Sequence, residues 1–321
     1  MVFYTTNLNS STNLKNFYRF MEHYHSLNSH IRSRFGCKLY KLSLDGGFGC
    51  PNRDGTVGSQ GCIFCSGRGS GDFAVPTGDD IAKALENARQ KVAHKNRDGR
   101  YIAFFQSFTG TYAPVERLRE LFSAAITQPD IAVLDVATRP DCVGDEVIAL
   151  LQELNRIKPV WVGLGLQTIH EDTARYIRRG YALPVFDDAV RRLKAAGLEV
   201  IVHMILGLPG ETPEMIWDTA RTIGQSGADG VKFHLLHVLR GTDLAADYEA
   251  GKFRALEMDE YIGLLAGCIQ RIPPSMVVHR LTGDGAKKDL IAPLWSGDKK
   301  RVLNAIHKHF QERNLQQGQL L

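Results

Sequence analysis

The sequence predicts a parallel α/β fold built from six strand–helix units. Short runs rich in β-branched and aromatic residues alternate along the chain with amphipathic helical stretches. The predicted strands are continuously apolar, which is typical of parallel strands that are buried on both faces. Six such units in series are compatible with a doubly wound sheet and with an incomplete barrel.

Each predicted strand precedes a helical stretch. The strands are expected at 38–44, 101–105, 131–136, 160–166, 199–206 and 231–236. The helices are expected at 81–92, 114–126, 145–155, 171–177, 185–196, 214–226 and 258–271. Thr77 or Asp79 is a suitable N-cap for the first helix, and Pro114 fits the first turn of the second. Gly197 ends the helix at 185–196, and the proline pair at 273–274 stops the last one.

The composition limits which class of protein this chain can belong to. The chain has 321 residues, of which 44% are hydrophobic and 23% are charged, as in a globular protein with a large core. No stretch approaches the roughly 20 apolar residues that span a bilayer, and the N-terminus does not resemble a secretory signal. We therefore expect a cytoplasmic protein without a membrane partner. The net charge of +4 is compatible with a nucleic-acid partner but does not require one.

The main fold is expected between residues 38 and 275. Residues 1–37 lead into it, and residues 276–321 form a basic C-terminal extension with a helix near 302–313.

Polar and reactive residues follow the predicted strands at the end where parallel α/β folds carry their active sites. A loop rich in Gly and Cys follows the first strand. The other groups of this kind are at 106–112, 138–142, 167–168, His203, His234 and His237. One rim of the sheet is therefore expected to collect the functional side chains.

Three cysteines of that loop, Cys50, Cys62 and Cys65, have the spacing C-x11-C-x2-C. In a compartment that keeps thiols reduced, such spacing indicates metal binding or catalysis rather than disulfides. Thiolates suit iron–sulfur clusters and zinc alike. Three ligands would leave one iron of a four-iron cluster open to a chelating substrate. The alternative is a structural zinc site with Cys37 as the fourth thiolate.

The loop resembles the cluster loop of radical S-adenosylmethionine (radical SAM) enzymes, including the aromatic Phe64 before the last cysteine. The long first gap is similar to that of the Elongator catalytic subunit and its small bacterial relatives. The similarity extends from about residue 30 to beyond residue 280 and includes the segments FFQSFTGTYAP, ATRPD, GLQTIHEDTARYIRRG, HMILGLPGET and VKFHLLHVLRGT.

This resemblance implies an incomplete (β/α)6 TIM-type barrel with short N- and C-terminal extensions. It implies that Cys50, Cys62 and Cys65 bind a 4Fe-4S cluster, which cleaves S-adenosylmethionine (SAM) to a 5′-deoxyadenosyl radical. A one-electron donor of the flavodoxin or ferredoxin type is implied as a partner.

The resemblance also assigns cofactor contacts. The turn that holds Ser107, Thr109 and Gly110 matches the segment whose backbone receives the methionine amino group. Gln167 matches a residue that hydrogen-bonds the cofactor. Arg179 matches an arginine that binds the methionine carboxylate. His203 occupies a position where some relatives carry an acidic ribose ligand.

Each of these residues also has a structural explanation. Gln167 is compatible with a cap on a buried strand, and the adjacent Arg178 and Arg179 with a solvated helix face. His203 is compatible with a hydrogen-bonded core histidine.

Four rim residues are candidates for substrate contact or catalysis: Arg139, Cys142, Lys232 and His234. Cys142 is of interest as a hydrogen donor, although free cysteines are often small buried hydrophobes. Lys232 is unusual in an apolar strand and is expected to point into the barrel mouth.

The Elongator resemblance implies modification of the C5 substituent of a wobble uridine in tRNA. The basic residues 287, 288 and 299–301 would suit phosphates, or would form a solvated surface. We recognise no acetyltransferase domain after the predicted barrel, so acetyl transfer is not expected. The alternatives are a radical enzyme acting on a small metabolite and a non-catalytic metal-binding protein.

Overall fold

A computed structural model describes residues 23–69, 71–78, 80–94, 98–283 and 285–321. Most of the predicted N-terminal extension and the predicted cap Asp79 lie outside these residues. Every predicted strand and helix is present within a few residues of its expected bounds.

The main sheet has eight strands in the order β2-β1-β3-β4-β5-β6-β7-β9, and all neighbours are parallel. The strands are β1 Tyr40–Asp45, β2 Val75–Pro76, β3 Tyr101–Phe105, β4 Ile131–Thr138, β5 Val160–Gln167, β6 Glu199–Leu206, β7 Gly230–Leu235 and β9 Val277–Arg280. From β3 to β7 each strand pairs with the next along the chain, which excludes a doubly wound sheet because such a sheet reverses its order. The arrangement is that of an incomplete TIM-type barrel, and β2 and β9 are its unjoined edges among the described residues.

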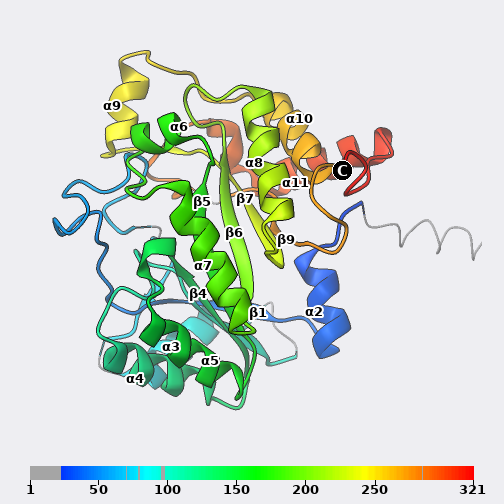
Figure 1. Ribbon diagram of the computed structural model, residues 1–321. Coiled ribbons are helices and arrows are strands. Elements are labelled where there is room, and N and C mark those ends of the chain that lie inside the picture. Colours follow the sequence, from blue (N-terminus) through cyan, green and yellow to red (C-terminus); the bar gives the residue numbers. More distant parts are fainter. Residues whose placement is uncertain (1–22, 70, 79, 95–97, 284) are drawn as a thin grey trace, which may run out of the picture.

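Most helices cover the outer face of the sheet (Figure 1). They are α2 Leu27–Phe35, α3 Ile81–Val92, α4 Val115–Ile126, α5 Asp145–Asn155, α6 Glu171–Tyr176, α7 Leu183–Ala195, α8 Pro213–Gln225, α9 Asp243–Glu249, α10 Met258–Ile269 and α11 Lys299–Glu312. Asp80 caps α3 by accepting from the backbone N–H of Lys83, so the prediction of Thr77 or Asp79 as its cap was wrong.

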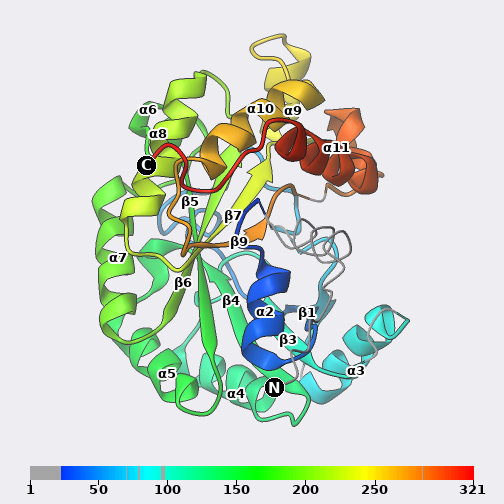
Figure 2. The ribbon, with the colours of Figure 1, turned by 90° about the vertical axis from the view of Figure 1, so that its right-hand side faces the viewer.

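The inside of the barrel is closed at the end where the strands begin. Figure 2 shows α2 lying in front of that end of the sheet. Ile31 of α2 packs there with apolar side chains of successive strands, among them Ile102, Trp161 and Ile201. This layer seals one end of the barrel, so a ligand has access from the opposite rim.

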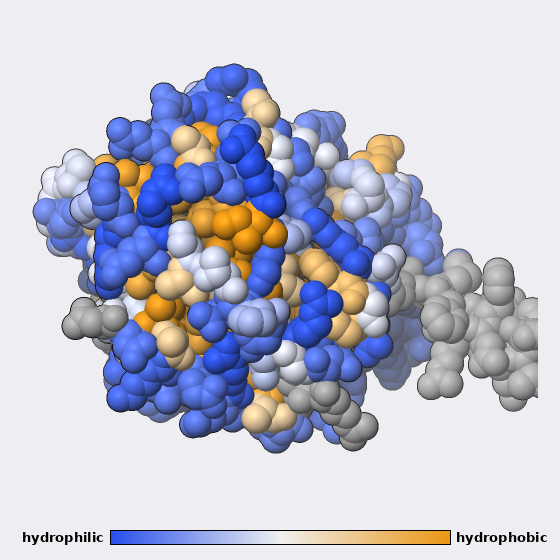
Figure 3. Space-filling model, turned by 90° about the horizontal axis from the view of Figure 1, so that it is seen from below, coloured by the Kyte–Doolittle hydropathy of each residue, from blue (hydrophilic) through white to orange (hydrophobic). Residues whose placement is uncertain are grey.

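The segment after residue 275 contributes to the sheet. β9 follows directly and pairs with β7. β10 (Leu290–Ala292) then pairs in antiparallel fashion with β8 (Val238–Leu239) in a separate small sheet. The face of the molecule seen in Figure 3 is mainly hydrophilic, with separate apolar areas near its middle.

Candidate functional site

The cysteine loop follows β1 and folds back on itself through backbone hydrogen bonds. The backbone N–H groups of Val57 and Gly58 donate to the carbonyl of Pro51, at 2.8 and 3.1 Å. The N–H of Gly61 donates to the carbonyl of Asn52 at 2.6 Å. Because these bonds tie the end of the long gap to its start, eleven intervening residues do not keep Cys50 away from Cys62.

The close cysteine pair is docked between two helices. The N–H of Ile63 donates to the carbonyl of Ile177, just after α6, at 3.3 Å. The N–H of Leu244, in α9, donates to the carbonyl of Ile63 at 2.9 Å. Phe64 packs against an apolar cluster that includes Ile177 and Leu244. Apolar side chains therefore shield this part of the loop from water.

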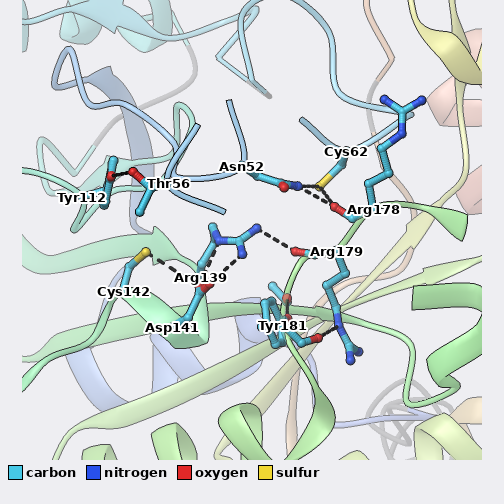
Figure 4. Close-up of polar contacts among 11 residues, drawn as sticks. Asn52, Thr56, Cys62, Tyr112, Arg139, Asp141, Cys142, Arg178, Arg179 and Tyr181 are labelled. Atoms are coloured by element: carbon cyan, nitrogen blue, oxygen red, sulfur yellow. Dashed lines mark hydrogen bonds and ion pairs between the residues drawn. The ribbon is translucent and has the colours of Figure 1, made fainter. Parts of the chain in front are cut away.

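Polar side chains of the cysteine segment hydrogen-bond to Cys62 and to the backbone around it (Figure 4 shows the Asn52 contact). The Asn52 amide donates to Cys62 Sγ at 3.5 Å and also to the carbonyl of Arg178. Arg53 donates to the carbonyls of Cys65 and Ser66, at 3.2 and 2.8 Å. Asn52 and Arg53 were missed at the sequence level, although both lie inside the cysteine segment.

The hydrogen bond between Cys62 and Cys65 shifts the pKa values of the two thiols in opposite directions. That bond lowers the pKa of Cys62 to about 7 against the effect of burial, with help from the positive charge of Arg139. The same bond, together with burial, raises the pKa of Cys65. A neighbouring thiol and cations thus favour a thiolate here, which is the form that binds metals.

The donors present, three free thiols of one loop, suit an iron–sulfur cluster. No group of three or more His, Cys, Asp or Glu side chains in the described ranges is close enough to hold one metal ion. In a cluster each thiolate binds a different iron, so its three cysteines need not converge on one point.

Cys37 lies far from the other three cysteines. It packs against the apolar cluster that holds Ile31 and Leu39 where the sheet begins, whereas Cys50 follows the far end of β1. Six strand residues at about 3.3 Å each separate the two by roughly 20 Å. The alternative of a zinc site with Cys37 as fourth ligand is therefore wrong.

The turn after β3 presents two buried hydroxyls to the same rim. Ser107 and Thr109 are 1% and 0% exposed, and neither hydroxyl has a hydrogen-bond partner in the described part of the chain. The N–H of Gly110 donates to the carbonyl of Ala137 at 2.9 Å, and a Cβ there would lie 2.6 Å from the same oxygen. Gly110 is therefore required for close packing on β4, and its N–H is already used.

Gln167 and His203 lie on the next strands. Gln167 ends β5 in the left-handed region with φ of 70°, and its amide packs over Gly165. His203 Nε2 is buried without a partner in the described chain, and a Cβ on Gly163 would come within 2.7 Å of it. Burial, and then the charge of Lys232, lower the pKa of His203, which keeps the imidazole neutral. A neutral imidazole with an unused nitrogen is suited to a ligand hydroxyl.

The guanidinium of Arg179 is hydrogen-bonded within its own loop. Its guanidinium donates to the carbonyls of Thr168 at 2.6 Å and Tyr181 at 3.0 Å, and it forms an ion pair with Glu171 at 3.1 Å. The side chain is 2% exposed, so the alternative of a solvated helix face is wrong for Arg179. This arrangement leaves little capacity for a methionine carboxylate.

Arg139 links the turn after β4 to the same loop. It donates to both oxygens of Asp141, at 2.9 and 2.6 Å, and to the carbonyl of Arg179 at 2.8 Å (Figure 4). Burial opposes its charge, but the bonds to Asp141 and the nearby Cys50 and Cys62 raise its pKa. Arg139 is thus a permanent cation beside the cysteines.

Cys142 lines a cavity of about 560 Å³ at the rim. The cavity lies between the long cysteine gap and the turns after β3 and β4, and its lining includes Val57, Tyr112 and Asp141. Burial, and then the charge of Asp141, raise the pKa of Cys142 to about 12. The sulfur therefore remains a thiol.

Lys232 points into the barrel, where it meets two charged residues that we did not single out from the sequence. Lys41 donates to Asp135 at 2.6 Å, and Lys232 lies 3.7 Å from the same carboxylate oxygen. Asp135 carries the signal that drew attention to Lys232, a charge within a mainly apolar strand, whereas the strand of Lys41 also holds Ser43 and Asp45. His234 lies next to His203, with ring centroids 5.4 Å apart.

Two family models match most of the chain. Residues 47–223 match the radical SAM superfamily, and residues 228–312 match its C-terminal domain. The chain belongs to the radical SAM superfamily. The enzymes of this superfamily use a 4Fe-4S cluster and S-adenosylmethionine, and they require an electron donor.

Individual proteins give a more specific comparison than the family models. The protein YtqA of Bacillus subtilis is 46% identical over 295 residues, which cover 92% of each chain. A tRNA uridine(34) acetyltransferase of Dehalococcoides mccartyi is 27% identical over 154 residues, 47% of this chain and 33% of that protein. The archaeal Elp3 of Methanocaldococcus infernus has a similar fold, with a TM-score of 0.66 at 16% identity over 87% of this chain and 64% of that one. In the described part of this radical SAM protein, no helix has the length and apolar character to cross a membrane.

Proposed function

We propose that this radical SAM enzyme modifies the C5 substituent of a wobble uridine in tRNA. The observation that supports radical chemistry at this site is the gathering of the cysteine loop and the turns after β3, β4 and β5 at one rim of a barrel whose other end is sealed. When bound, the cluster and S-adenosylmethionine supply a 5′-deoxyadenosyl radical that abstracts hydrogen from carbon.

Cys50, Cys62 and Cys65 would hold the cluster. Asn52 and Arg53 fix the loop around it, and Arg139 supplies a positive charge beside the thiolates. Side chains that hydrogen-bond ligating sulfurs orient them and tune their basicity. The apolar packing of Phe64 supports exclusion of water from the reacting groups.

S-adenosylmethionine would bind across the turns beside the cysteine loop. The unused hydroxyls of Ser107 and Thr109 and the unused nitrogen of His203 are available to its polar groups. Gly110 and Gln167 shape the backbone at the rim. Arg179 fixes the loop between β5 and α7, and this role supports binding without direct contact.

Two observations favour tRNA as the substrate. The relative from D. mccartyi is, by its name, an enzyme of tRNA uridine 34. The cations at 287, 288 and 299–301 are all exposed, as a phosphate-binding surface requires. Substrate contacts would come from Arg139, Cys142, Lys232 and His234. The electron donor would be a flavodoxin or ferredoxin, and the protein would act in the cytoplasm.

The decisive experiment is nucleoside mass spectrometry of tRNA from cells with and without the gene. We expect one modified uridine to be lost, or its precursor to accumulate, in the deletion strain. An unchanged nucleoside profile, together with full activity in the absence of RNA, would instead support a small metabolite as substrate.

The cluster assignment has its own test. Anaerobic reconstitution should give a brown protein that forms 5′-deoxyadenosine from S-adenosylmethionine after reduction, and Cys62→Ala should abolish both properties. Cys268→Ala is the matched control, because that cysteine is fully buried in α10 away from the loop. A Cys62→Ala protein that keeps cluster and cleavage would refute the assignment.

A further inference from the structure

A small charged cluster lies inside the barrel, below the rim. Lys41 of β1, Asp135 of β4 and Lys232 of β7 bring their side chains together there. Both ammonium groups also lie over the ring of Phe104, at 4.4 and 4.6 Å from its centroid. Three strands that are distant in the sequence therefore contribute to one charged site.

The charges of this cluster do not balance. Asp135 is fully buried and forms its short ion pair with Lys41. Lys232 is 5% exposed in its side chain, and its Nζ makes no hydrogen bond within the described chain. Among these three side chains, two lysines thus share one carboxylate.

A buried ammonium that shares its carboxylate with a second lysine lowers stability, because the loss of hydration is only partly compensated. Burial is the largest effect on Lys232 and lowers its pKa to about 7, against the attraction of Asp135. A methionine at this position would fill the same space without that cost. Stability alone therefore does not explain a lysine at this position.

The cluster is continuous with the rim site. His234 lies two residues after Lys232 on β7, so both side chains point to the same side of the strand. His203 pairs with Lys232 in register, and the ring nitrogens Nε2 of both histidines lack partners in the described residues. Unused polar groups therefore lead from the rim to the Lys232 ammonium.

We propose that Lys232, with Lys41 beside it, binds a carboxylate that enters the barrel from the rim. An anionic oxygen would supply the hydrogen bond that the Lys232 ammonium lacks within the described chain. Two sources carry this chemistry: the methionine carboxylate of S-adenosylmethionine, which Arg179 is poorly placed to bind, and an acidic group on the substrate. The second source rests on the proposed function, and the first does not.

The test uses Lys232→Met in the reconstituted holoenzyme. Equilibrium dialysis measures the affinity for S-adenosylmethionine and for its decarboxylated analogue. Turnover is measured with tRNA purified from cells that lack the gene. Lys194→Met is the matched control, because that lysine already pairs with both oxygens of Asp229 outside the barrel.

Two outcomes support the proposal. If the carboxylate belongs to methionine, affinity for S-adenosylmethionine falls at least about tenfold while affinity for the decarboxylated analogue is unchanged. If it belongs to the substrate, both affinities are kept and tRNA turnover falls by a similar factor. In either case the unfolding midpoint of Lys232→Met does not fall.

One outcome overturns it: a folded Lys232→Met protein with unchanged affinities and turnover. Asp135→Asn is a second variant that removes the competing carboxylate and is expected to tighten binding of the same ligand. Weaker binding in Asp135→Asn would count against the proposal. A wild-type enzyme that leaves tRNA unchanged would refute the proposed substrate, and the affinity measurements would still decide the role of Lys232.

Discussion

Replacing Arg179 by methionine distinguishes two roles for this residue. It either binds the methionine carboxylate directly or fixes the loop between β5 and α7. The guanidinium donates to the carbonyls of Thr168 and Tyr181, at 2.6 and 3.0 Å, in a site where the side chain is 2% exposed. Hydrogen bonds that involve a charged partner contribute about 1.5–3 kcal/mol each. Loss of two such bonds should therefore lower the free energy of unfolding by about 3–5 kcal/mol, after allowance for some rehydration of the carbonyls.

The adjacent residue provides a matched control. Arg178 forms one ion pair with Asp243, and the side chains of both residues are substantially exposed. Because exposed ion pairs contribute about 0–1 kcal/mol, Arg178→Met should have a small effect. Urea denaturation of the two variants gives the comparison. If Arg179→Met is as stable as Arg178→Met but binds S-adenosylmethionine much more weakly, the positioning role is refuted and direct carboxylate binding is favoured.

Three further predictions concern the rim. Asn52→Ala removes the amide that donates to Cys62 Sγ, so its cluster should be lost to a chelator about 10–100-fold more readily, and an unchanged rate would contradict this. Gly163→Ala places a Cβ 2.7 Å from His203 Nε2 and should cost about 1–3 kcal/mol in urea denaturation, whereas Gly144→Ala, which meets nothing within 4 Å, should cost less. Because burial and Asp141 raise the pKa of Cys142 to about 12, its alkylation rate should keep rising tenfold per pH unit up to about pH 12. A plateau near pH 9, as in the unfolded chain, would show that the thiol is not protected.

The sequence determined the order of strands and helices and the cysteine motif, because these depend on local patterns of apolar residues and on spacing. It did not predict β2, β8, β9 or β10, since strands of two to four residues are too short to show a pattern. The choice between a doubly wound sheet and an incomplete barrel required pairing information, which the strand order supplied.

The tertiary structure alone decided what individual polar side chains contact. Cys37 and Cys50 are near in sequence but lie at opposite ends of β1, which excludes a shared metal. Arg179 suited a ligand in sequence, yet in the fold it satisfies carbonyls of its own loop. Lys41, Asp135 and Lys232 are separated by up to 191 residues and meet only because three strands face one interior. Hydrogen bonds and ion pairs depend on distances of a few ångströms between residues far apart in the chain, and folding fixes those distances.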